Sequence, residues 1–433
     1  MELVLLGTGS ADGWPNPFCV CASCVAARWT GEIRGQTAVL VDGRLMLDCG
    51  PEAPRAAQRF GRSLSDVRAI LLTHDHPDHT GPAALLWRHW AGATEHLDLI
   101  GPPSALTACQ DWIGPDDPVR LRPVRAGDRL DVAGYDVRVL PAAHERDAVL
   151  YDVANDTARI LYGTDTGPLP AAAVAAMRDA AYDTVLLEET CGDWTEHATG
   201  HLDLTTFPRT LAELRRSGAI TPATDVVAIH LGHRNPPTQE LSRRLSAWGA
   251  RVEPDGAVLQ AGQREPDEKP PRRVLLLGGA RSGKSVEAER RFAAEPKVTY
   301  VATSIVDPAD EEWVARVTTH RARRPPQWTT IETVELAALL REATGPVLVD
   351  CLTLWLGAFL DSPDLHDRID DLIDAWRGTT ANVIAVSNEV GSGVVPATES
   401  GRRFRDELGR LNARIAAESD EVALLVAGRV MRL

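Results

Sequence analysis

The chain has 433 residues, of which 44% are hydrophobic and 25% charged, as expected for a soluble protein with more than one hydrophobic core. Its formal charge of −15 argues against a nucleic-acid partner, which would require a basic face. The first residues lack a basic segment, and no apolar stretch is long enough to cross a bilayer. We therefore expect a cytoplasmic protein without membrane insertion.

Short apolar runs that predict β-strands recur through residues 1–262. They lie at 3–6, 38–41, 45–47, 69–72, 137–140, 160–162, 185–187 and 226–229. Histidine or aspartate stands at the ends of four of these runs. The first part of the chain is therefore predicted to be rich in strands, with its chemistry at the strand ends.

Three of the seven cysteines, Cys19, Cys21 and Cys24, lie within six residues. This spacing is unlike a disulfide framework and favours a metal site, with four scattered thiols elsewhere. The surrounding residues are rich in proline and glycine and offer little core for the cysteines to join. Three thiolates and one further ligand would close the tetrahedral set of a structural zinc ion.

The densest group of candidate ligands follows the strand predicted at 69–72. It consists of His74, His76, Asp78 and His79, four potential ligands within six residues. A loop of this kind can present His74 and His76 to one metal ion while Asp78 and His79 face another. Isolated histidines are usually structural, but this density predicts a metal centre.

The H-x-H-x-D-H motif at 74–79 resembles that of the metallo-β-lactamase fold superfamily, and the resemblance covers nearly all of residues 1–262. It implies an αββα sandwich with a dinuclear centre of Zn²⁺ or Mn²⁺ at one edge. The further ligands that it implies, each just past an apolar run, are His144, Asp165 and His230. In this arrangement one site contains His74, His76 and His144, the other contains Asp78, His79 and His230, and Asp165 is shared.

Within the superfamily the resemblance is strongest to phosphoribosyl 1,2-cyclic phosphodiesterases and next to tRNA-processing ribonuclease Z. It depends on Gly7-Thr8-Gly9-Ser10, on the cysteine triplet and on His233, three residues beyond His230. It implies that His233 completes the structural zinc site and that His201 lies near the leaving group of an unidentified phosphodiester. Ribonuclease Z is the weaker parallel, because the chain is acidic and lacks a long basic insertion.

Two other functions remain open for the N-terminal part. The same metals polarise a carbonyl group equally well, so a carbonyl-ester hydrolase such as a thioesterase or lactonase is one alternative. The second alternative is a metal-stabilised module without turnover, although the intact set of ligands argues against it.

Residues 263–273 contain three prolines, seven charged residues and no apolar side chain. Such a segment cannot join a core and is predicted to be an extended linker. It separates a domain over 1–262 from a second domain over 274–433.

The second domain opens with an apolar strand and a phosphate-binding loop. The loop is Gly278-Gly279-Ala280-Arg281-Ser282-Gly283-Lys284-Ser285, and a helix-like stretch follows at 286–292. The spacing G-x-x-x-x-G-K-S surrounds a β-phosphate with backbone N–H groups, places Lys284 on the β- and γ-phosphate oxygens and offers the Ser285 hydroxyl to Mg²⁺. We therefore predict a site for a nucleoside triphosphate, ATP or GTP.

Alternating strands and helices follow the loop. Strands are expected at 298–302, 347–350, 383–386 and 422–426, with a helix at 311–319 and others between the later strands. This alternation predicts a parallel sheet with helices on both faces, so that both domains are of the α/β class. Asp350 ends one strand and is predicted to be the acidic Mg²⁺ partner opposite Ser285.

Six segments of this domain, in order, resemble the family of bifunctional adenosylcobinamide kinases / adenosylcobinamide-phosphate guanylyltransferases of cobalamin assembly. They are the phosphate loop and residues 300–303, 316–325, 350–355, 387–396 and 402–412. The resemblance implies phosphorylation of adenosylcobinamide, followed by transfer of GMP from GTP to adenosylcobinamide phosphate through a guanylylated His320. It also implies a homo-oligomer, by family precedent a trimer.

Imidazole suits the role implied for His320, since it is a good nucleophile near neutral pH and a good leaving group from a phosphoramidate. The neighbouring Arg316, Arg321, Arg323 and Arg324 offer guanidinium groups for phosphates, although a solvated basic face explains at least half of them. A simple nucleotide-dependent kinase, in which His320 has no role, is the alternative for this domain.

Overall fold

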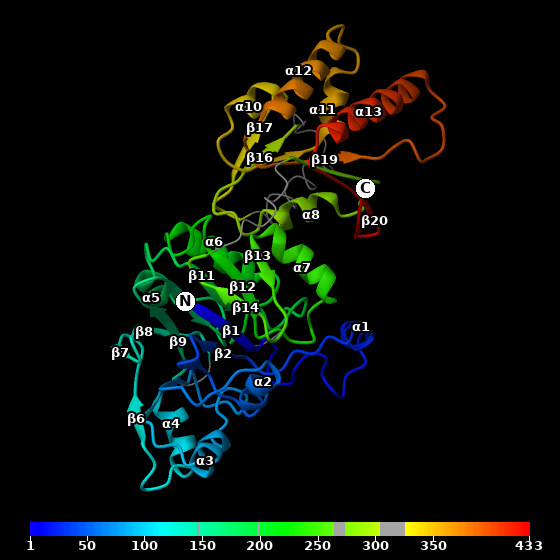
Figure 1. Cartoon of the computed structure of the whole chain (residues 1–433). Helices are drawn as coiled ribbons and strands as arrows, with labels where there is room; N and C mark the ends of the chain where they lie inside the picture. Colours follow the sequence, from blue (N-terminus) through cyan, green and yellow to red (C-terminus); the bar gives the residue numbers. More distant parts are fainter. Residues whose placement is uncertain (145–146, 197–199, 264–272, 304–324) are drawn as a thin grey trace. The chain divides into compact units, whose positions relative to one another are not determined.

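A computed structural model describes residues 1–144, 147–196, 200–263, 273–303 and 325–433. The chain divides into two compact units, Met1–Asp267 and Glu268–Leu433 (Figure 1). Most of the predicted linker, the helix expected at 311–319, His320 and the four neighbouring arginines lie outside the described residues. Within the described part, no helix combines the length and the apolar character needed to cross a membrane.

The N-terminal unit contains two seven-stranded sheets. The first has the order β14 (Val258–Gln260), β1 (Glu2–Gly7), β2 (Ala38–Val41), β3 (Leu45–Leu47), β4 (Ala69–Leu71), β5 (Leu97–Gly101) and β6 (Val119–Pro123). The second has the order β13 (Ala250–Val252), β12 (Asp225–Ile229), β11 (Thr184–Glu188), β10 (Arg159–Gly163), β9 (Val149–Ala154), β8 (Tyr135–Pro141) and β7 (Arg129–Val132).

The two sheets pack face to face through alternate residues of their strands. Leu3 and Leu5 of β1 join a buried cluster with Val137 and Val139 of β8, whereas Leu6 belongs to a second cluster on the outer face of the first sheet. Successive side chains of a strand point to opposite faces, so an uninterrupted apolar strand serves both clusters. This explains why residues 3–6 of β1 are all apolar.

Helices cover the outer face of each sheet, which completes the αββα sandwich predicted from the sequence. The helices of this unit are α1 (Ala22–Thr30), α2 (Ala53–Arg59), α3 (Ala83–Trp90), α4 (Pro103–Gln110), α5 (Ala171–Ala176), α6 (Thr206–Arg216) and α7 (Thr238–Ala247). Helices α2 and α4 contact the first sheet, and α5 and α7 contact the second (Figure 1).

The parallel strands of each sheet bring polar residues to a common edge. Strands β3, β4 and β5 are parallel, as are β10, β11 and β12. Their carboxyl ends lead into Asp48, His74, Asp165, Glu188 and His230. The sheet topology therefore gathers residues that are far apart in the sequence.

The C-terminal unit is built on one seven-stranded sheet. Its order is β17 (Thr329–Glu332), β16 (Thr299–Ala302), β18 (Val347–Asp350), β19 (Val383–Asn388), β15 (Arg273–Gly278), β20 (Glu421–Val426) and β21 (Arg429–Arg432). All neighbouring strands are parallel except β20 and β21, which form an antiparallel hairpin at one edge. The prediction of a parallel sheet is thus correct up to this hairpin, which contains no crossover helix.

Helices lie on both faces of this sheet. They are α8 (Lys284–Arg291), α10 (Leu336–Glu342), α11 (Leu352–Phe359), α12 (Leu365–Gly378) and α13 (Glu399–Ala417). In Figure 1 the last four lie on one side of the strands and α8 on the other. The longest, α13, begins where the Thr398 side chain accepts a hydrogen bond from Gly401 N, and it buries Leu408, Leu411 and Ile415 at helical spacing.

Candidate functional site

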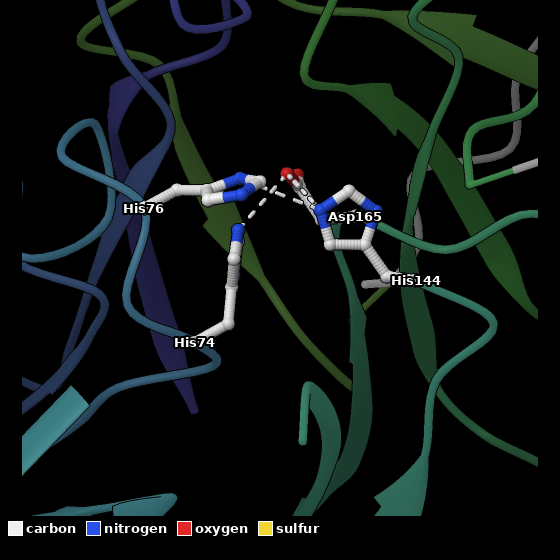
Figure 2. Close-up of side chains that lie close together, drawn as sticks. All are labelled: His74, His76, His144 and Asp165. Carbon is white, nitrogen blue, oxygen red and sulfur yellow. Dashed lines mark hydrogen bonds and ion pairs between the residues drawn. The ribbon is translucent and has the colours of Figure 1, made fainter. Parts of the chain in front are cut away.

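The first group of candidate ligands in the N-terminal unit contains His74, His76, His144 and Asp165. Figure 2 shows the three imidazole rings around the carboxylate of Asp165. Asp165 Oδ2 lies 3.4 Å from His74 Nε2 and 3.7 Å from His144 Nε2, and His144 Nε2 lies 3.4 Å from His76 Nδ1. The structure thus brings together ligands from three separate stretches of chain.

A second group contains Asp78, His79, His230 and again Asp165. His79 Nε2 lies 3.0 Å from Asp78 Oδ2 and 3.3 Å from Asp165 Oδ1. His230 Nε2 lies 3.4 Å from Asp78 Oδ2 and 3.1 Å from Asp165 Oδ1. Asp165 therefore turns one carboxylate oxygen toward each group, which is the geometry of a carboxylate that bridges two metal ions.

The spacing of these donor atoms fits metal ions. Two donors about 2.1 Å from a tetrahedral zinc ion are roughly 3.4 Å from each other. Nε2 of His74 is buried, and apart from its 3.4 Å contact with Asp165 Oδ2 it has no hydrogen-bond partner among the described residues, which leaves it available to a metal ion. Imidazole and carboxylate donors suit Zn²⁺, while carboxylates also suit Mn²⁺.

The pKa shifts of four donors agree with metal binding. Burial lowers the pKa values of His76 and His144, which keeps these rings neutral. Burial alone would raise the pKa of Asp78, but His230 and His79 bring it well below its usual value. The same two histidines hold the pKa of Asp165 well below its usual range despite complete burial. Neutral imidazole and ionised carboxylate are the forms that bind metal ions. At the fifth, His79, burial is outweighed by the carboxylates of Asp165 and Asp48, which raise its pKa well above the usual value, so this ring has to lose a proton when a metal ion binds.

A shell of partners holds the histidine rings by their second nitrogen. Nδ1 of His79 lies 2.7 Å from Asp48 Oδ2, Nδ1 of His144 lies 2.9 Å from Gly200 O, and Nδ1 of His230 lies 2.9 Å from Thr190 Oγ1. These contacts direct Nε2 of each ring toward the centre, as in most protein metal sites. Asp48 was not predicted as a functional residue, although it directly follows an apolar run.

His201 lies beside both groups. Its ring centroid is 4.8 Å from that of His144 and 5.7 Å from that of His230. Its Nδ1 lies 3.1 Å from Oε1 of the fully buried Glu188. Burial alone would lower the pKa of His201, but the charge and hydrogen bond of Glu188 raise it to about 9. The contact with Glu188 therefore favours the protonated ring, which can donate a proton.

Glu188 links this histidine to a metal ligand. Its carboxylate accepts hydrogen bonds from Thr166 N at 2.6 Å, from Leu202 N at 3.3 Å and from the Thr190 hydroxyl, which also contacts His230. Sequence reasoning missed Glu188 as well. The only available signal was a carboxylate at the end of the apolar run 185–187.

The cysteine triplet forms a separate group, in which the sulfur atoms of Cys19, Cys21 and Cys24 lie close together. Cys21 precedes helix α1, and its sulfur accepts a hydrogen bond from Cys24 N at 3.4 Å. Cys21 N in turn donates to the sulfur of Cys19 at 3.4 Å. Despite burial, the hydrogen bond from Cys24 lowers the pKa of Cys21, which favours the thiolate that zinc requires, whereas burial raises the pKa of Cys24 to about 12.

His233 lies beside the cysteines, but its ring nitrogens are not part of their group among the described residues. Its carbonyl oxygen is 3.7 Å from Cys21 Sγ, while its Nδ1 lies 2.8 Å from Asp12 Oδ2. A carboxylate on one ring nitrogen is the usual outer partner of a zinc-binding histidine. This contact leaves Nε2 as the ring atom for a metal ion.

The phosphate loop of the C-terminal unit joins β15 to α8. A Cβ atom at Gly278 would lie 2.5 Å from Leu425 O, so only glycine fits there. Gly283 has a φ of 99° and precedes the first residue of α8, a left-handed conformation that glycine adopts readily. The helix begins at Lys284, two residues before the predicted start, and its N-terminus thus follows directly on the loop.

Lys284 begins helix α8, which follows strand β15, and Asp350 ends strand β18, which precedes helix α11. Lys284 is buried, and its ammonium group donates to Gly279 O at 2.7 Å across the loop. The half-buried Asp350 ends β18, and its Oδ2 accepts a hydrogen bond from the Tyr300 hydroxyl at 2.6 Å. A lysine folded over the loop and a carboxylate at a neighbouring strand end suit a Mg²⁺–nucleotide complex.

Two protein families match the chain. The family described as "Cobinamide kinase / cobinamide phosphate guanyltransferase" matches residues 274–433, and the "Beta-lactamase superfamily domain" matches residues 43–231. Both resemblances predicted from the sequence are thereby confirmed. The match at 43–231 includes all seven residues of the two ligand groups described above.

Individual proteins are similar to one part of the chain or the other. The bifunctional adenosylcobalamin biosynthesis protein CobP of Pseudomonas aeruginosa is 46% identical over 170 residues, which cover 37% of this chain and 96% of that protein. A ribonuclease Z of Mycobacterium bovis is 27% identical over 214 residues, which cover 44% of this chain and 71% of that protein. A solved structure of a diphosphatase from the PhnP family covers 60% of this chain and 97% of its own, at 22% identity and a TM-score of 0.48.

Proposed function

The chain belongs, through residues 274–433, to the cobinamide kinase / cobinamide phosphate guanyltransferase family, and we propose that it is a two-domain enzyme of cobalamin assembly. The domain over 274–433 phosphorylates adenosylcobinamide and then transfers GMP from GTP to the product. The domain over 1–262 is a metal-dependent hydrolase of a phosphodiester. The observation that carries the first activity is the phosphate loop, with Lys284 folded over it, inside the matched family segment.

Both C-terminal reactions use one nucleotide site in this proposal. The backbone N–H groups of the loop bind the β-phosphate, and Lys284 moves from Gly279 O to the β- and γ-phosphate oxygens. Mg²⁺, held by Ser285 and Asp350, would neutralise charge on the phosphates. The kinase step, with ATP or GTP as donor, moves the γ-phosphoryl group to the hydroxyl of adenosylcobinamide.

The second reaction passes through His320. An imidazole nitrogen attacks the α-phosphorus of GTP, a P–N bond forms, and pyrophosphate leaves. The phosphate oxygen of adenosylcobinamide phosphate then attacks the same phosphorus, which breaks the P–N bond and frees the imidazole. The product is adenosylcobinamide-GDP.

Intact-mass spectrometry tests this proposal. After incubation with GTP and Mg²⁺, the full chain should gain the mass of one GMP group, and His320→Ala should not, while it still phosphorylates adenosylcobinamide. His366→Ala, which removes an exposed histidine of α12, is the matched control and should form the adduct. An adduct on His320→Ala would assign the nucleophile to another residue, and the lack of an adduct on the wild type would favour a simple kinase.

The proposal for the N-terminal domain depends on Asp165, which turns one oxygen to each ligand group. Two bound metal ions, Zn²⁺ or Mn²⁺, would supply a nucleophilic hydroxide and neutralise charge on the phosphodiester. His201 protonates the departing oxygen, and Glu188 holds its ring and raises its pKa to about 9. Fusion to the C-terminal domain suggests a phosphoester of the same pathway as substrate.

Metal analysis together with two model substrates tests the N-terminal activity. The zinc- or manganese-loaded chain should hydrolyse bis(p-nitrophenyl) phosphate, and the double variant Asp78→Ala/His79→Ala should lose one metal and this activity while the kinase continues. A chain that holds both metals and hydrolyses only p-nitrophenyl acetate would be a carbonyl-ester hydrolase. A loaded chain inert to both substrates would support a module without turnover.

We propose two further properties. Cys19, Cys21 and Cys24 bind a structural zinc ion with Nε2 of His233, so Cys21→Ser should reduce the zinc content by one and lower the melting temperature of the N-terminal domain. The chain forms a homotrimer, which light scattering of the purified protein can test.

A further inference from the structure

The carboxylate of Asp350 is held by a buried tyrosine on the adjacent strand. The Tyr300 hydroxyl donates to Asp350 Oδ2 at 2.6 Å, and Tyr300 is only 2% exposed. Strands β16 and β18 are parallel, with Tyr300 opposite Leu348 and Ala302 opposite Asp350. Because residues two apart on a strand share a face, Tyr300 and Asp350 lie on the same face of the sheet.

This face is the one that the phosphate-loop helix covers. Tyr300 belongs to a buried cluster that includes Leu348 of β18 and Ala288 of α8, together with Phe292 just after that helix. The tyrosine ring is thus fixed by apolar packing, and its hydroxyl reaches the carboxylate of Asp350. Since α8 begins at Lys284, the Tyr300–Asp350 pair lies on the side of the sheet where the nucleotide phosphates are proposed to bind.

A second side chain from the end of β16 holds the backbone next to Asp350. The Thr303 hydroxyl accepts a hydrogen bond from Cys351 N at 2.9 Å and donates one to Cys351 O at 2.6 Å. Thr303 is 1% exposed, so these bonds are shielded from water. Tyr300 therefore holds the carboxylate of Asp350, and Thr303 holds the main chain next to it.

We propose that Tyr300 is a positioning residue for Mg²⁺–nucleotide binding, and that Thr303 assists it. The Tyr300 hydroxyl occupies Oδ2 of Asp350 and thereby fixes the carboxylate plane, so that Oδ1 remains for the metal ion or its bound water. Outer partners of this kind align ligating carboxylates in many metal sites, and their loss weakens metal binding about 10- to 100-fold. The inference rests on the proposed role of Asp350 toward Mg²⁺.

The pair also explains why the cluster contains a tyrosine. Tyr300 is the one tyrosine in residues 274–433, and its neighbours in the cluster are apolar apart from Trp328. Burying a hydroxyl is costly unless it finds a partner, so packing alone would favour phenylalanine here. The hydroxyl is thus expected to act through Asp350.

Tyr300→Phe tests the proposal in the full chain, with the N-terminal metals already bound. Binding of a fluorescent, non-hydrolysable GTP analogue is measured without metal and at increasing Mg²⁺ concentration. The Mg²⁺ concentration that gives half of the maximal increase in nucleotide affinity should be about tenfold higher in Tyr300→Phe than in the wild type. The nucleotide affinity in the absence of Mg²⁺ should stay within about twofold of the wild-type value. Thr379→Val, which removes a hydroxyl bonded to Leu340 O in the same unit, should leave both values unchanged.

Two further variants separate the possible failures. If Asp350→Asn leaves the Mg²⁺ dependence unchanged, the proposed role of Asp350 itself is wrong. If Asp350→Asn raises the Mg²⁺ requirement but a folded Tyr300→Phe does not, the positioning role of Tyr300 is overturned. In the double variant, Tyr300→Phe should add nothing to the effect of Asp350→Asn, because both act on one group. If Tyr300→Phe unfolds at a lower temperature than the wild type, Thr303→Val is measured in its place. An unchanged Mg²⁺ requirement in Thr303→Val would count against the proposal.

Discussion

The proposed metal centre of the N-terminal unit and the phosphate loop of the C-terminal unit are built in opposite ways. The phosphate loop is one run of eight residues, 278–285, whose binding groups are mostly backbone N–H groups. The metal centre takes seven side chains from four separate stretches of chain. A local backbone site depends on glycine conformations and one lysine, whereas a dispersed side-chain site depends on every strand end that contributes to it.

The two sites also differ in what their charged groups contact. Around the metal centre, Asp48, Glu188 and the threonine hydroxyls hold the rings by hydrogen bonds inside the sandwich. In the phosphate loop, Lys284 makes its bond to Gly279 O and has to move when phosphate binds. We therefore expect substitutions around the metal centre to act through metal affinity, and substitutions in the loop to act through nucleotide binding.

Asp165→Asn should have the largest effect, because Asp165 is the only residue that belongs to both ligand groups. An amide keeps the size of the side chain but removes the charge that neutralises two metal ions. We expect both metals to be lost and phosphodiester hydrolysis to fall by at least about a thousandfold, equivalent to roughly 4 kcal/mol. Metal content and initial rates are the measurements.

The matched control for Asp165→Asn is Asp225→Asn, which changes an aspartate that pairs with Arg251 at the start of β12. It should retain both metals and nearly all of the activity, since exposed and partly exposed ion pairs contribute little. Equal metal content in Asp165→Asn and the wild type would show that the two groups do not share a bridging ligand.

Lys284→Ala should have the next largest effect, on the other domain. Both C-terminal reactions require a triphosphate in the same loop, so kinase activity and formation of the GMP adduct should each fall by about two to three orders of magnitude. The N-terminal hydrolase should be unchanged. Lys297→Ala, at an exposed lysine, is the control. Guanylylation that persists in Lys284→Ala would mean that the two reactions use different nucleotide sites.

The difference between a contiguous site and a dispersed site also determines how much of each could be predicted from the sequence. The phosphate loop was predictable from spacing alone, because its residues are contiguous. The grouping of His144, Asp165 and His230 with residues 74–79 depends on strand pairing between distant segments, so it could be expected only from a family resemblance. The structure brings these residues together, but spacing by itself does not determine which strand ends become neighbours.

Some strands were missed although they are largely apolar and buried, such as β5 and β9, whereas others gave no signal because they lack an apolar run. Strand β17 has the sequence Thr329-Thr330-Ile331-Glu332, is exposed throughout and, among the described strands, lies at the sheet edge beside β16, so composition gives no signal. Strand β6 alternates arginine with apolar residues and lies at a sheet edge. Asp48 and Glu188 were missed for another reason, because their role consists of hydrogen bonds to histidines rather than a motif.

Asp48→Asn tests whether such partners matter to the metal centre. Asp48 is fully buried, and its two oxygens accept hydrogen bonds from Thr73 N at 2.8 Å and from the Tyr162 hydroxyl at 3.0 Å, in addition to contacting His79 Nδ1. An amide has a single acceptor oxygen and cannot satisfy all of these donors. We expect metal affinity to fall about 10- to 100-fold, as measured by competition with a chelator.

Asn suits the backbone at position 48, where φ is 57°, so the variant should fold. Asp152→Asn is the control, since Asp152 is a buried aspartate of the same unit that pairs with Arg138 and Arg159 instead of a histidine. It should lower stability without changing metal affinity. Identical metal affinity in Asp48→Asn and the wild type would limit Asp48 to a role in packing.

Glu188→Gln should have the smallest effect at neutral pH and the clearest dependence on pH. A general acid works only while protonated, so hydrolysis through His201 should persist up to its pKa of about 9 and fall above it. Removing the charge of Glu188 lowers that pKa toward the ordinary value near 6.5. At pH 7.5 the protonated fraction then drops to about a tenth, so the rate should fall about tenfold, with little change near pH 6.

Glu189→Gln is a close control: burial raises the pKa of Glu189 well above its usual value, and a carboxyl group that is already neutral loses no charge on this substitution. The alkaline limb of the rate profile should therefore move to lower pH in Glu188→Gln and stay in place in Glu189→Gln. An alkaline limb at the same pH in all three proteins would exclude His201 as the proton donor.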